Sequence, residues 1–214
     1  MKTAIVLGAT GLVGKAVVSQ LIQEDGISKI IAVTRREHDF NNRKVHNLVV
    51  NFEQLAEYAD QFKADMLFSC LGTTVKQAGS IAAQRNVDLD YQYEIADIAA
   101  QNQIAHYLLV SSSGANSQSK NAYLQMKGEL EEKVKQLPFK CISIVQPSLL
   151  KGERNHFRLA ESLGNLILPL VCLIPGLRQY RPISGQQVAK KLVSLSKTHV
   201  TGSNVYRLDA LFKL

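Results

Sequence analysis

The chain is poor in the residues that build disulfide frameworks and metal sites. Its three cysteines, Cys70, Cys141 and Cys172, stand in apolar surroundings, show no Cys-x-x-Cys spacing and form an odd total. Disulfide-rich secreted domains carry an even set of cysteines, and zinc sites usually place cysteines in closely spaced pairs. We therefore expect buried, reduced thiols in a cytoplasmic protein, with neither a disulfide framework nor a bound metal.

Long apolar runs are also missing. The longest apolar region, residues 163–177, is interrupted by Asn165, Pro169 and Pro175 and falls short of the roughly 20 residues that span a bilayer. The first residues, MKTAIVLGATG, pass from a short apolar run directly into glycines, which is typical of a first β-strand and not of a signal peptide. We expect no membrane span and no signal peptide.

No Pro/Gly/Ser-rich linker, internal repeat or low-complexity tract divides the 214 residues. A hydrophobic content of 46% with 20% charged residues is typical of a globular protein and argues against disorder. A chain of this length can bury one sizeable core. We therefore expect a single domain over residues 1–214.

Acidic residues are scarce in the last third of the chain, and the whole net charge of +7 lies there. We find no nucleic-acid-binding motif of the usual kinds and expect no nucleic-acid partner. A basic region can instead bind an anionic small molecule, or it can be a solvated surface. The arginines that flank the apolar region lead to the hypothesis of an anionic substrate; they are Arg154, Arg158, Arg178 and Arg181.

Apolar segments rich in β-branched residues alternate with segments of helical periodicity, which predicts a parallel sheet covered by helices on both faces. The fold class is thus α/β, a doubly wound parallel sheet, with residues 148–214 as a small substrate-side C-terminal portion. Strands are predicted at 3–9, 29–35, 47–51, 65–72, 106–114, 139–147 and 204–208. Helices are predicted at 12–24, 53–62, 81–102, around 123–136, near 157–168 and at about 185–196.

The segment GATGLVG between the first predicted strand and helix places Gly8, Gly11 and Gly14 three residues apart. Glycines at such a turn let the backbone approach a pyrophosphate closely, and the following helix directs its N-terminus at the anion. A glycine-rich turn without a ligand is the alternative. We predict that a dinucleotide binds to this turn, through Gly8, Thr10, Gly11, Leu12, Val13 and Gly14.

The end of the second predicted strand carries Arg35 and Arg36. NAD enzymes usually have an acidic residue here that binds the adenosine ribose, whereas guanidinium groups suit a 2′-phosphate. We therefore expect NADP(H) as the preferred cofactor, with NAD(H) open as the second choice.

Two further segments follow predicted strands at the same edge of the sheet. Asn51 and Phe52 follow the third strand, where Asn51 is expected to meet the adenine edge. The fourth strand ends in a glycine loop at the crevice where such folds bind their cofactor. We expect this loop to contact the dinucleotide through Cys70, Leu71, Gly72 and Thr73.

A serine-rich strand end and a Tyr-x-x-x-Lys spacing predict the chemistry. Tyr123 and Lys127 lie four residues apart and share one face of a helix, and SSSG stands nine to twelve residues before the tyrosine. Carbonyl reduction needs a proton donor and a group that orients the oxygen. We assign these roles to Tyr123 and Ser112. Lys127 supplies positive charge that favours the ionised phenol, and it can also hold the nicotinamide ribose.

These motifs together resemble the short-chain dehydrogenase/reductase superfamily of the atypical or extended type. The blocks VVNFEQL, CLGTT, VDLDY, SSSGA and YLQMKGELE further resemble the Tat-interacting oxidoreductase-like proteins, over roughly residues 1–160. The resemblance implies a Rossmann fold that binds NADP(H), with Ser111 and Ser112 as the family's serine pair. Asp88 stands where extended members often have an asparagine, and Asn51 replaces an aspartate. The nicotinamide side is implied to be lined by Pro147, Ser148 and Leu149.

Three functions are compatible with this pattern. The first is an NADP(H)-dependent reductase of a small carbonyl or enone compound, acting as a monomer or homodimer. The second is a redox-sensing regulator that binds NADP(H) without turnover, and the third is isomerisation of a nucleotide sugar. A sensor does not need a proton donor, so the presence of Tyr123 and Lys127 favours the reductase.

Overall fold

The computed structural model describes residues 1–151, 181–198 and 200–213. Within them, a seven-stranded parallel sheet has the order β3-β2-β1-β4-β5-β6-β9. The predicted doubly wound α/β fold is confirmed. The strands are β1 (Lys2–Leu7), β2 (Ile27–Thr34), β3 (Val45–Val49), β4 (Met66–Ser69), β5 (His106–Val110), β6 (Cys141–Gln146) and β9 (Gly202–Arg207).

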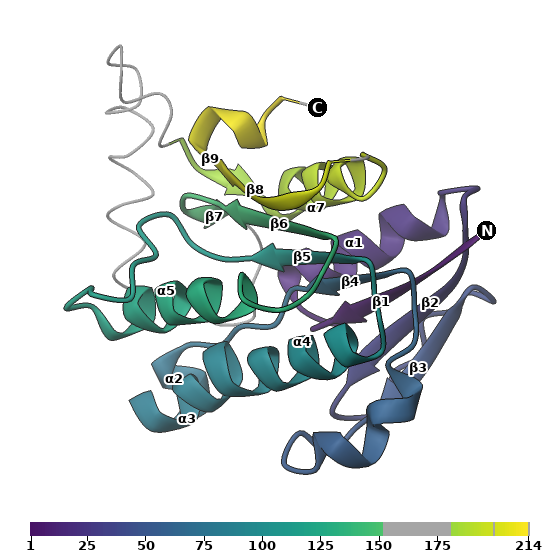
Figure 1. Cartoon of the computed structure of the whole chain (residues 1–214), viewed down its shortest axis with the longest axis horizontal. Coiled ribbons are helices and arrows are strands. Elements are labelled where there is room, and N and C mark those ends of the chain that lie inside the picture. Colours follow the sequence, from purple (N-terminus) through teal and green to yellow (C-terminus); the bar gives the residue numbers. More distant parts are fainter. Residues whose placement is uncertain (152–180, 199, 214) are drawn as a thin grey trace.

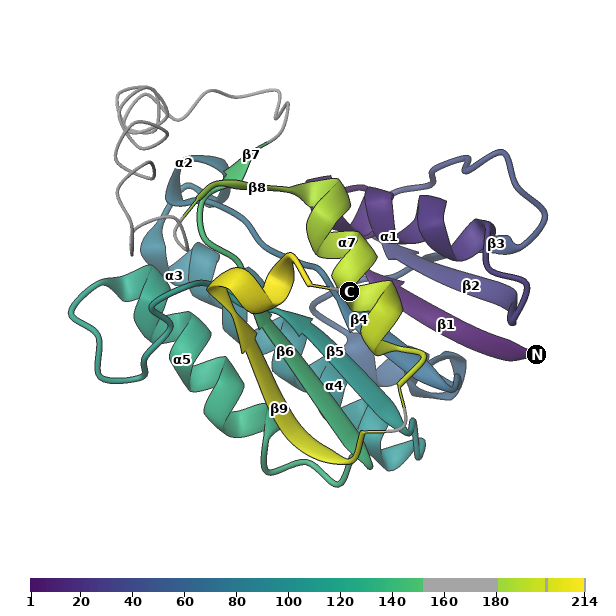
Figure 2. The ribbon, with the colours of Figure 1, turned by 90° about the horizontal axis from the view of Figure 1, so that it is seen from above.

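Helices cover both faces of the sheet. Figures 1 and 2 show α1 (Leu12–Ile22) and α7 (Gly185–Leu195) on one face, and α4 (Tyr91–Gln101) and α5 (Ala122–Val134) on the other. The chain begins at β1 in the middle of the sheet, proceeds outward to β3 and then returns to β4 beside β1. The carboxyl ends of β1 and β4 therefore lie at the point where the winding reverses, which is the usual ligand-binding crevice of such sheets.

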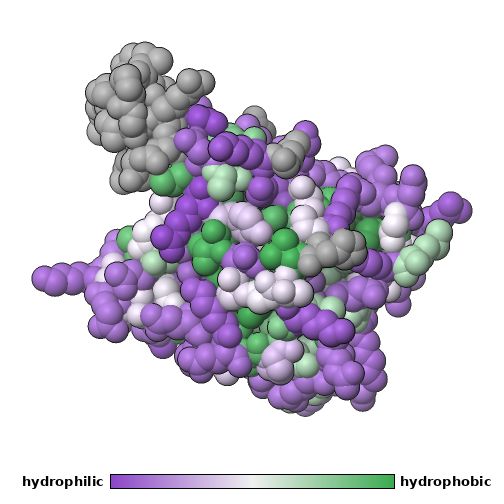
Figure 3. All heavy atoms as spheres, turned by 45° about the horizontal axis from the view of Figure 1, so that its top comes forward, coloured by the Kyte–Doolittle hydropathy of each residue, from purple (hydrophilic) through white to green (hydrophobic). Residues whose placement is uncertain are grey.

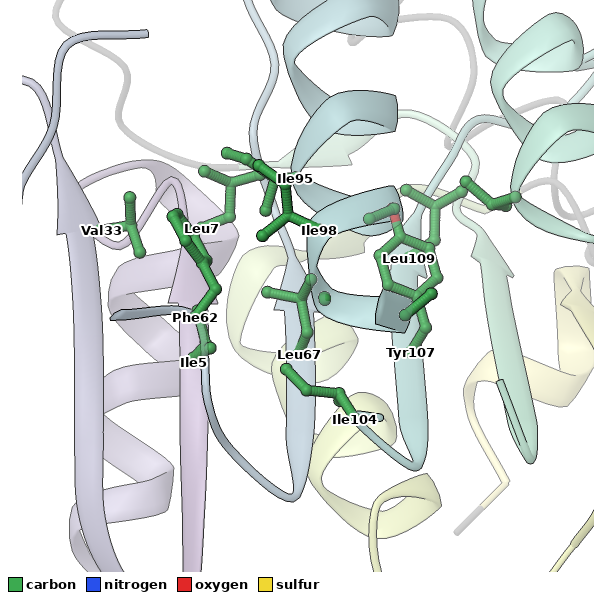
Figure 4. Packing of buried hydrophobic residues seen from close by; sticks show 14 of the residues in the cluster. Ile5, Leu7, Val33, Phe62, Leu67, Ile95, Ile98, Ile104, Tyr107 and Leu109 are labelled. Carbon is green, nitrogen blue, oxygen red and sulfur yellow. The ribbon is translucent and has the colours of Figure 1, made fainter. Parts of the chain in front are cut away.

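Each face of the sheet has its own apolar core. Side chains alternate between the two faces of a strand, so Ile5 and Leu7 of β1 pack with Leu67 of β4 against α4, as Figure 4 shows. Their neighbours Ala4 and Val6 pack against α1 and α7 instead. Because these strands are buried on both faces, they appear in the sequence as uninterrupted apolar runs.

Several predicted elements differ in detail. The predicted helix at 53–62 is a 3₁₀-helix, η1 (Leu55–Gln61), whose N-terminus has no side-chain cap. The strand predicted at 65–72 ends at Ser69, and residues 70–73 form a loop before a short helix, α2 (Val75–Ala78), that periodicity did not reveal. Such short segments lack enough residues to establish a period.

The helix predicted at 81–102 is continuous but irregular. It comprises α3 (Ile81–Arg85), a π-helical turn η2 (Asn86–Asp90) and then α4. A short two-stranded sheet, β7 (Leu150–Lys151) with β8 (Ile183–Ser184), was not predicted. The predicted helix near 157–168 lies outside the described residues.

The surface seen in Figure 3 is mostly hydrophilic, with hydrophobic residues in small separate groups between the polar ones. Among the residues coloured there, no broad apolar area covers this face. In the described part of the chain, every helix is too short or too polar to cross a membrane.

Candidate active site

The loops that contain the predicted site residues all follow the carboxyl-terminal ends of strands. Because the strands are parallel, their carboxyl ends lie side by side in the sheet order. The loop after β1 touches the loop after β4: a Cβ added to Gly8 would lie 2.8 Å from the carbonyl oxygen of Cys70 and 2.9 Å from Cα of Leu71. The two loops therefore meet at the crevice between β1 and β4.

The glycine turn is shaped for close approach of a ligand. Gly8 has a φ of +75°, which favours glycine. The amide of Gly11 donates to the carbonyl of Gly8 at 2.9 Å, and no side chain caps α1 at Gly11. Thr10 and Gly11 are exposed. The N-terminus of α1 thus presents free amide groups and a positive dipole end, which fit a pyrophosphate.

Gly14 has a packing role behind the turn. A Cβ on Gly14 would lie 2.2 Å from the carbonyl oxygen of Gly8, so any side chain there would push α1 away from the turn. Val13 is buried in the core beside it. Leu12 is half-buried and packs against the N-terminus of α7, where a Cβ on Gly185 would lie 2.9 Å from its side chain.

Arg35 and Arg36 directly follow β2 and are both exposed. No carboxylate of the described residues forms an ion pair with either guanidinium. Two exposed guanidinium groups therefore stand directly after β2.

Asn51 and Phe52 lie two and three residues beyond β3. Asn51 is exposed, and its side-chain amide donates to Gln54 Oε1 at 2.6 Å. Phe52 is buried, with its ring 5.4 Å from the ring of Tyr91. The side chain of Asn51 is therefore accessible to solvent, whereas the ring of Phe52 belongs to the core.

Helix α5 carries Tyr123 and Lys127. Asn121 caps the helix by accepting a hydrogen bond from the amide of Leu124 at 3.1 Å, which fixes where the helix begins. Tyr123 is half-buried and is the second residue of the helix. Lys127 is only 2% exposed, so its ammonium is held inside the protein rather than extended into water.

Asp88 is the partner of Lys127. The ammonium Nζ lies 3.0 Å from Asp88 Oδ1, and both side chains are almost fully buried. The other carboxylate oxygen accepts a hydrogen bond from the amide of Thr73 at 3.0 Å. One carboxylate therefore connects Lys127 to the loop after β4. Gln84 also binds this loop, by donating to the carbonyl of Thr73 at 3.3 Å.

The position of Asp88 depends on the π-helical turn. Asp88 lies within η2, and its carbonyl accepts a hydrogen bond from Gln92 Nε2 at 3.0 Å. Gln92 also accepts one from Ser69 at the end of β4, at 2.9 Å. Single π turns within α-helices are frequent at functional sites. This turn ties the helix to β4 through buried side chains.

The charge on Lys127 is retained despite its burial. Burial alone would lower its pKa, but the charges of Asp88, Tyr123 and Glu131 more than offset this effect and raise the pKa above the ordinary value. Lys127 is therefore a cation at neutral pH. Burial raises the pKa of the nearby Cys70 thiol to about 12, and the charge of Lys127 opposes the rise only in part. Cys70 stays protonated.

The two serines after β5 differ in their surroundings. Ser111 is buried and donates to Glu131 Oε1, which also accepts a hydrogen bond from Gln146 Nε2 at 2.7 Å. Ser112 is half-buried, and the next amide, of Ser113, donates to the carbonyl of Pro147 at 2.9 Å. Ser111 thus holds the ends of β5 and β6 in place, while Ser112 remains available at the edge.

The segment after β6 borders the C-terminal portion. Pro147 is buried, whereas Ser148 and Leu149 are half-buried. Ser148 Oγ donates to the carbonyl of Arg181 at 2.6 Å. The Arg181 guanidinium is 3.3 Å from Asp209 and 3.7 Å from the ring of Phe212, so its charge is already compensated. The other three arginines of the anion hypothesis lie outside the described residues.

Two functional positions were missed or left open by the sequence. Glu131 follows Lys127 by four residues and Tyr123 by eight, so the helical period already placed a carboxylate on the same face. Asp88 gave no such signal, because its partner lies on another helix. Among the described residues, no group of three His, Cys, Asp or Glu side chains is placed to hold a metal ion.

A family model described as NAD(P)H-binding matches residues 8–163. Protein HTATIP2 from Rattus norvegicus is 38% identical over 167 residues, which cover 76% of this chain and 69% of that protein. Protein FMP52, mitochondrial, from Saccharomyces cerevisiae is 32% identical over 213 residues, covering 90% and 86%. The solved structure of MoeE5 in complex with UDP-glucuronic acid and NAD has a TM-score of 0.73 at 14% identity, covering 96% of this chain and 76% of that chain.

Proposed function

This chain belongs to the NAD(P)H-binding family. On that premise we propose that it is an atypical short-chain dehydrogenase/reductase, an NADP(H)-dependent reductase of a small carbonyl or enone compound. The buried pair of Lys127 and Asp88, one helical turn along α5 from Tyr123, carries this proposal. A charged lysine is costly to bury. A cation one helical turn from a tyrosine is what transfer of the phenolic proton requires, and this supports turnover over cofactor binding alone.

Each residue has a distinct role in the proposed reaction. A nicotinamide cofactor held at the glycine turn would supply the hydride for the electrophilic carbon of the substrate. Tyr123 donates its phenolic proton to the substrate oxygen of a carbonyl compound, so that the substrate gains one hydride and one proton and becomes an alcohol. The ammonium of Lys127 stabilises the phenolate that Tyr123 leaves behind, and solvent then restores the proton.

Ser112 orients the substrate oxygen. It follows β5 at the same edge as Tyr123, and its hydroxyl is only weakly engaged, with the carbonyl of Ser113 at 3.5 Å. A hydroxyl donor that faces developing negative charge lowers the barrier to reduction. Ser111, by contrast, keeps the strand ends in position through Glu131.

The preference for NADP(H) rests on Arg35 and Arg36. Both are exposed after β2, and no described carboxylate competes for them. A 2′-phosphate would form charge-assisted hydrogen bonds with guanidinium groups, whereas the free ribose hydroxyls of NAD(H) would gain far less. Thermal unfolding with NADP, NADPH, NAD and NADH tests this choice, because ligands that bind the folded state raise the Tm. Stabilisation by NAD but not by NADP would contradict it.

Turnover is tested by following NADPH oxidation with aldehydes, ketones, quinones and enones. Tyr123→Phe removes the proposed proton donor, and we expect it to lower kcat by about 10²- to 10⁴-fold while the Kd for NADPH changes little. Tyr93→Phe is the matched control, since Tyr93 lies on α4 with its ring beneath Lys133 and has no role in the site. Full activity of Tyr123→Phe would remove the proposed acid.

A regulatory protein that binds NADP(H) without turnover is the competing function. It predicts a rise in Tm with the cofactor but no NADPH oxidation with any of these substrates. We propose the cytoplasm as the compartment. Since the yeast relative is named a mitochondrial protein, cell fractionation distinguishes the two locations.

A further inference from the structure

A single asparagine side chain fastens the backbone on which Arg35 and Arg36 stand. Asn47 lies in the edge strand β3 and is half-buried. Its Nδ2 donates to the carbonyl of Ala32 at 3.0 Å and to Thr34 Oγ1 at 2.7 Å. Its Oδ1 accepts a hydrogen bond from the amide of His38 at 2.7 Å. The amide therefore joins the last part of β2 to the residue that follows the arginine pair by two positions.

Thr34 continues this connection into the turn. Its hydroxyl, which accepts from Asn47, donates to the carbonyl of Arg36 at 2.7 Å. The side chain is 6% exposed, so water competes little for these bonds. The turn from Thr34 to His38 is consequently held at Arg36 by Thr34 and at His38 by Asn47.

These bonds are additional to those of the sheet. The backbones of β2 and β3 already pair in register, with Ala32 opposite Asn47 and Thr34 opposite Val49. The Asn47 amide and the Thr34 hydroxyl extend the order past the last strand residue into a loop. The guanidinium groups of Arg35 and Arg36 remain exposed above this ordered backbone.

We propose that Asn47, acting through Thr34, is a positioning residue that sets the selectivity for a 2′-phosphorylated dinucleotide; this rests on the proposed use of NADP(H). A phosphate contact gains affinity when its donors are already held in place, because less conformational entropy is lost on binding. NAD lacks the 2′-phosphate and gains little from an ordered arginine turn. Loosening the turn therefore weakens NADP binding selectively.

The test measures Kd for NADP⁺ and NAD⁺, and for 2′,5′-ADP as a fragment that carries the 2′-phosphate, with the full chain and its variants. We expect Asn47→Ala to weaken NADP⁺ and 2′,5′-ADP by about tenfold, which corresponds to about 1.4 kcal/mol, and to change the Kd for NAD⁺ less than about twofold.

Matched variants separate positioning from general stability. Thr34→Val removes the hydroxyl at nearly constant volume and should reproduce the selective loss, whereas Thr34→Ser keeps the hydroxyl and should retain selectivity. Asn204→Ala is the control. Asn204 lies in β9, the outermost strand on the side of the sheet opposite β3, and its side chain also donates to two backbone carbonyls. This variant should alter the Kd of neither cofactor. If Asn47→Ala fails to fold, the two Thr34 variants decide the result.

Each outcome has a defined meaning. Selective loss in Asn47→Ala and Thr34→Val, with retention in Thr34→Ser, supports the inference. A second outcome begins with a wild type that prefers NADP⁺ and an Arg36→Ala variant that has lost this preference. If Asn47→Ala and Thr34→Val then keep the preference, or lose affinity for both cofactors equally, this inference is overturned and the proposed function stands. A wild type without any preference for NADP⁺ overturns both.

Discussion

The ammonium of Lys127 lies 3.0 Å from the carboxylate of Asp88, and each side chain is no more than 3% exposed. The two residues stand on different helical segments, α5 and η2, which pack together on one face of the sheet. The pair neutralises two buried charges and at the same time attaches the loop after β4 through the amide of Thr73. This relationship gives the first prediction.

Asp88→Ala should destabilise the fold by about 3–5 kcal/mol, because it leaves the Lys127 charge buried without a partner. Asp88→Asn keeps an oxygen for the Thr73 amide and should cost less. Urea denaturation measures both. Asp60→Ala is the control, since Asp60 pairs with Lys63 on the exposed surface and such pairs contribute little. Equal effects of Asp88→Ala and Asp60→Ala would disprove this account.

Glu131→Ala should destabilise the protein by roughly 2–3 kcal/mol, because the buried Ser111 and Gln146 side chains both lose their acceptor. Activity should fall as well, since Ser112 directly follows Ser111. Glu132→Ala, at the exposed neighbouring position, is the comparison. Denaturation and NADPH oxidation are measured on the same samples, and a Glu131 variant as stable as the Glu132 variant would refute the positioning role.

Gly14→Ala should destabilise the fold by about 1–3 kcal/mol and weaken cofactor binding, because the added Cβ would lie 2.2 Å from the Gly8 carbonyl oxygen. The helix would have to move away from the turn. Gly26→Ala meets no atom within 4 Å and should leave both properties nearly unchanged. Thermal unfolding with and without NADPH measures the two effects. Normal cofactor stabilisation of Gly14→Ala would contradict the predicted geometry.

His106 should make the protein less stable in acid. Burial lowers its pKa from 6.5 to about 4, so between these pH values the unfolded chain binds a proton that the folded chain excludes. The contribution to stability is complete above pH 6.5 and is lost as the pH falls toward 4, by roughly 3 kcal/mol.

The pH dependence of unfolding in urea measures this loss. His106 Nε2 contacts Ser143 Oγ at 2.9 Å and Cys141 Sγ at 3.2 Å, and His106→Gln removes the titrating ring. The variant should show a flatter profile between pH 6.5 and 4. His46→Gln, at an exposed position of β3, should retain the wild-type profile. A steep profile in His106→Gln would assign the acid sensitivity to other groups.

The glycine turn and the alternation of elements could be predicted from the sequence because they depend on neighbouring residues. Gly8 has a positive φ and Gly14 lies against the Gly8 carbonyl, both within one short turn. The apolar runs of β1 and β4 follow from burial on both faces of a parallel sheet. The secondary structure of the irregular helical segments was harder to predict. The irregular segments, η1 and the turn η2, do not repeat at a single period, so their form depended on what they pack against.

The spacing of Tyr123 and Lys127 was likewise visible in the sequence, because the helical period alone places them on one face. The sequence did not reveal that Lys127 is buried, or that Asp88 is its partner. The side chain of a lysine on a helix reaches water unless the neighbouring elements exclude it, and here the π turn of another helical segment fills that space.

At Arg35 and Arg36 too, the sequence showed which residues are present, and the fold showed which side chains hold their backbone. The sequence by itself determined the fold class, the glycine turn and the positive charge at the end of β2, since each is encoded in short-range patterns. Only the tertiary structure decided which polar groups are buried together: Asp88 with Lys127, Ser111 with Glu131, and Asn47 with Thr34. Loss of water on packing is what forces such groups to find partners, and which partners are within reach depends on how distant segments pack.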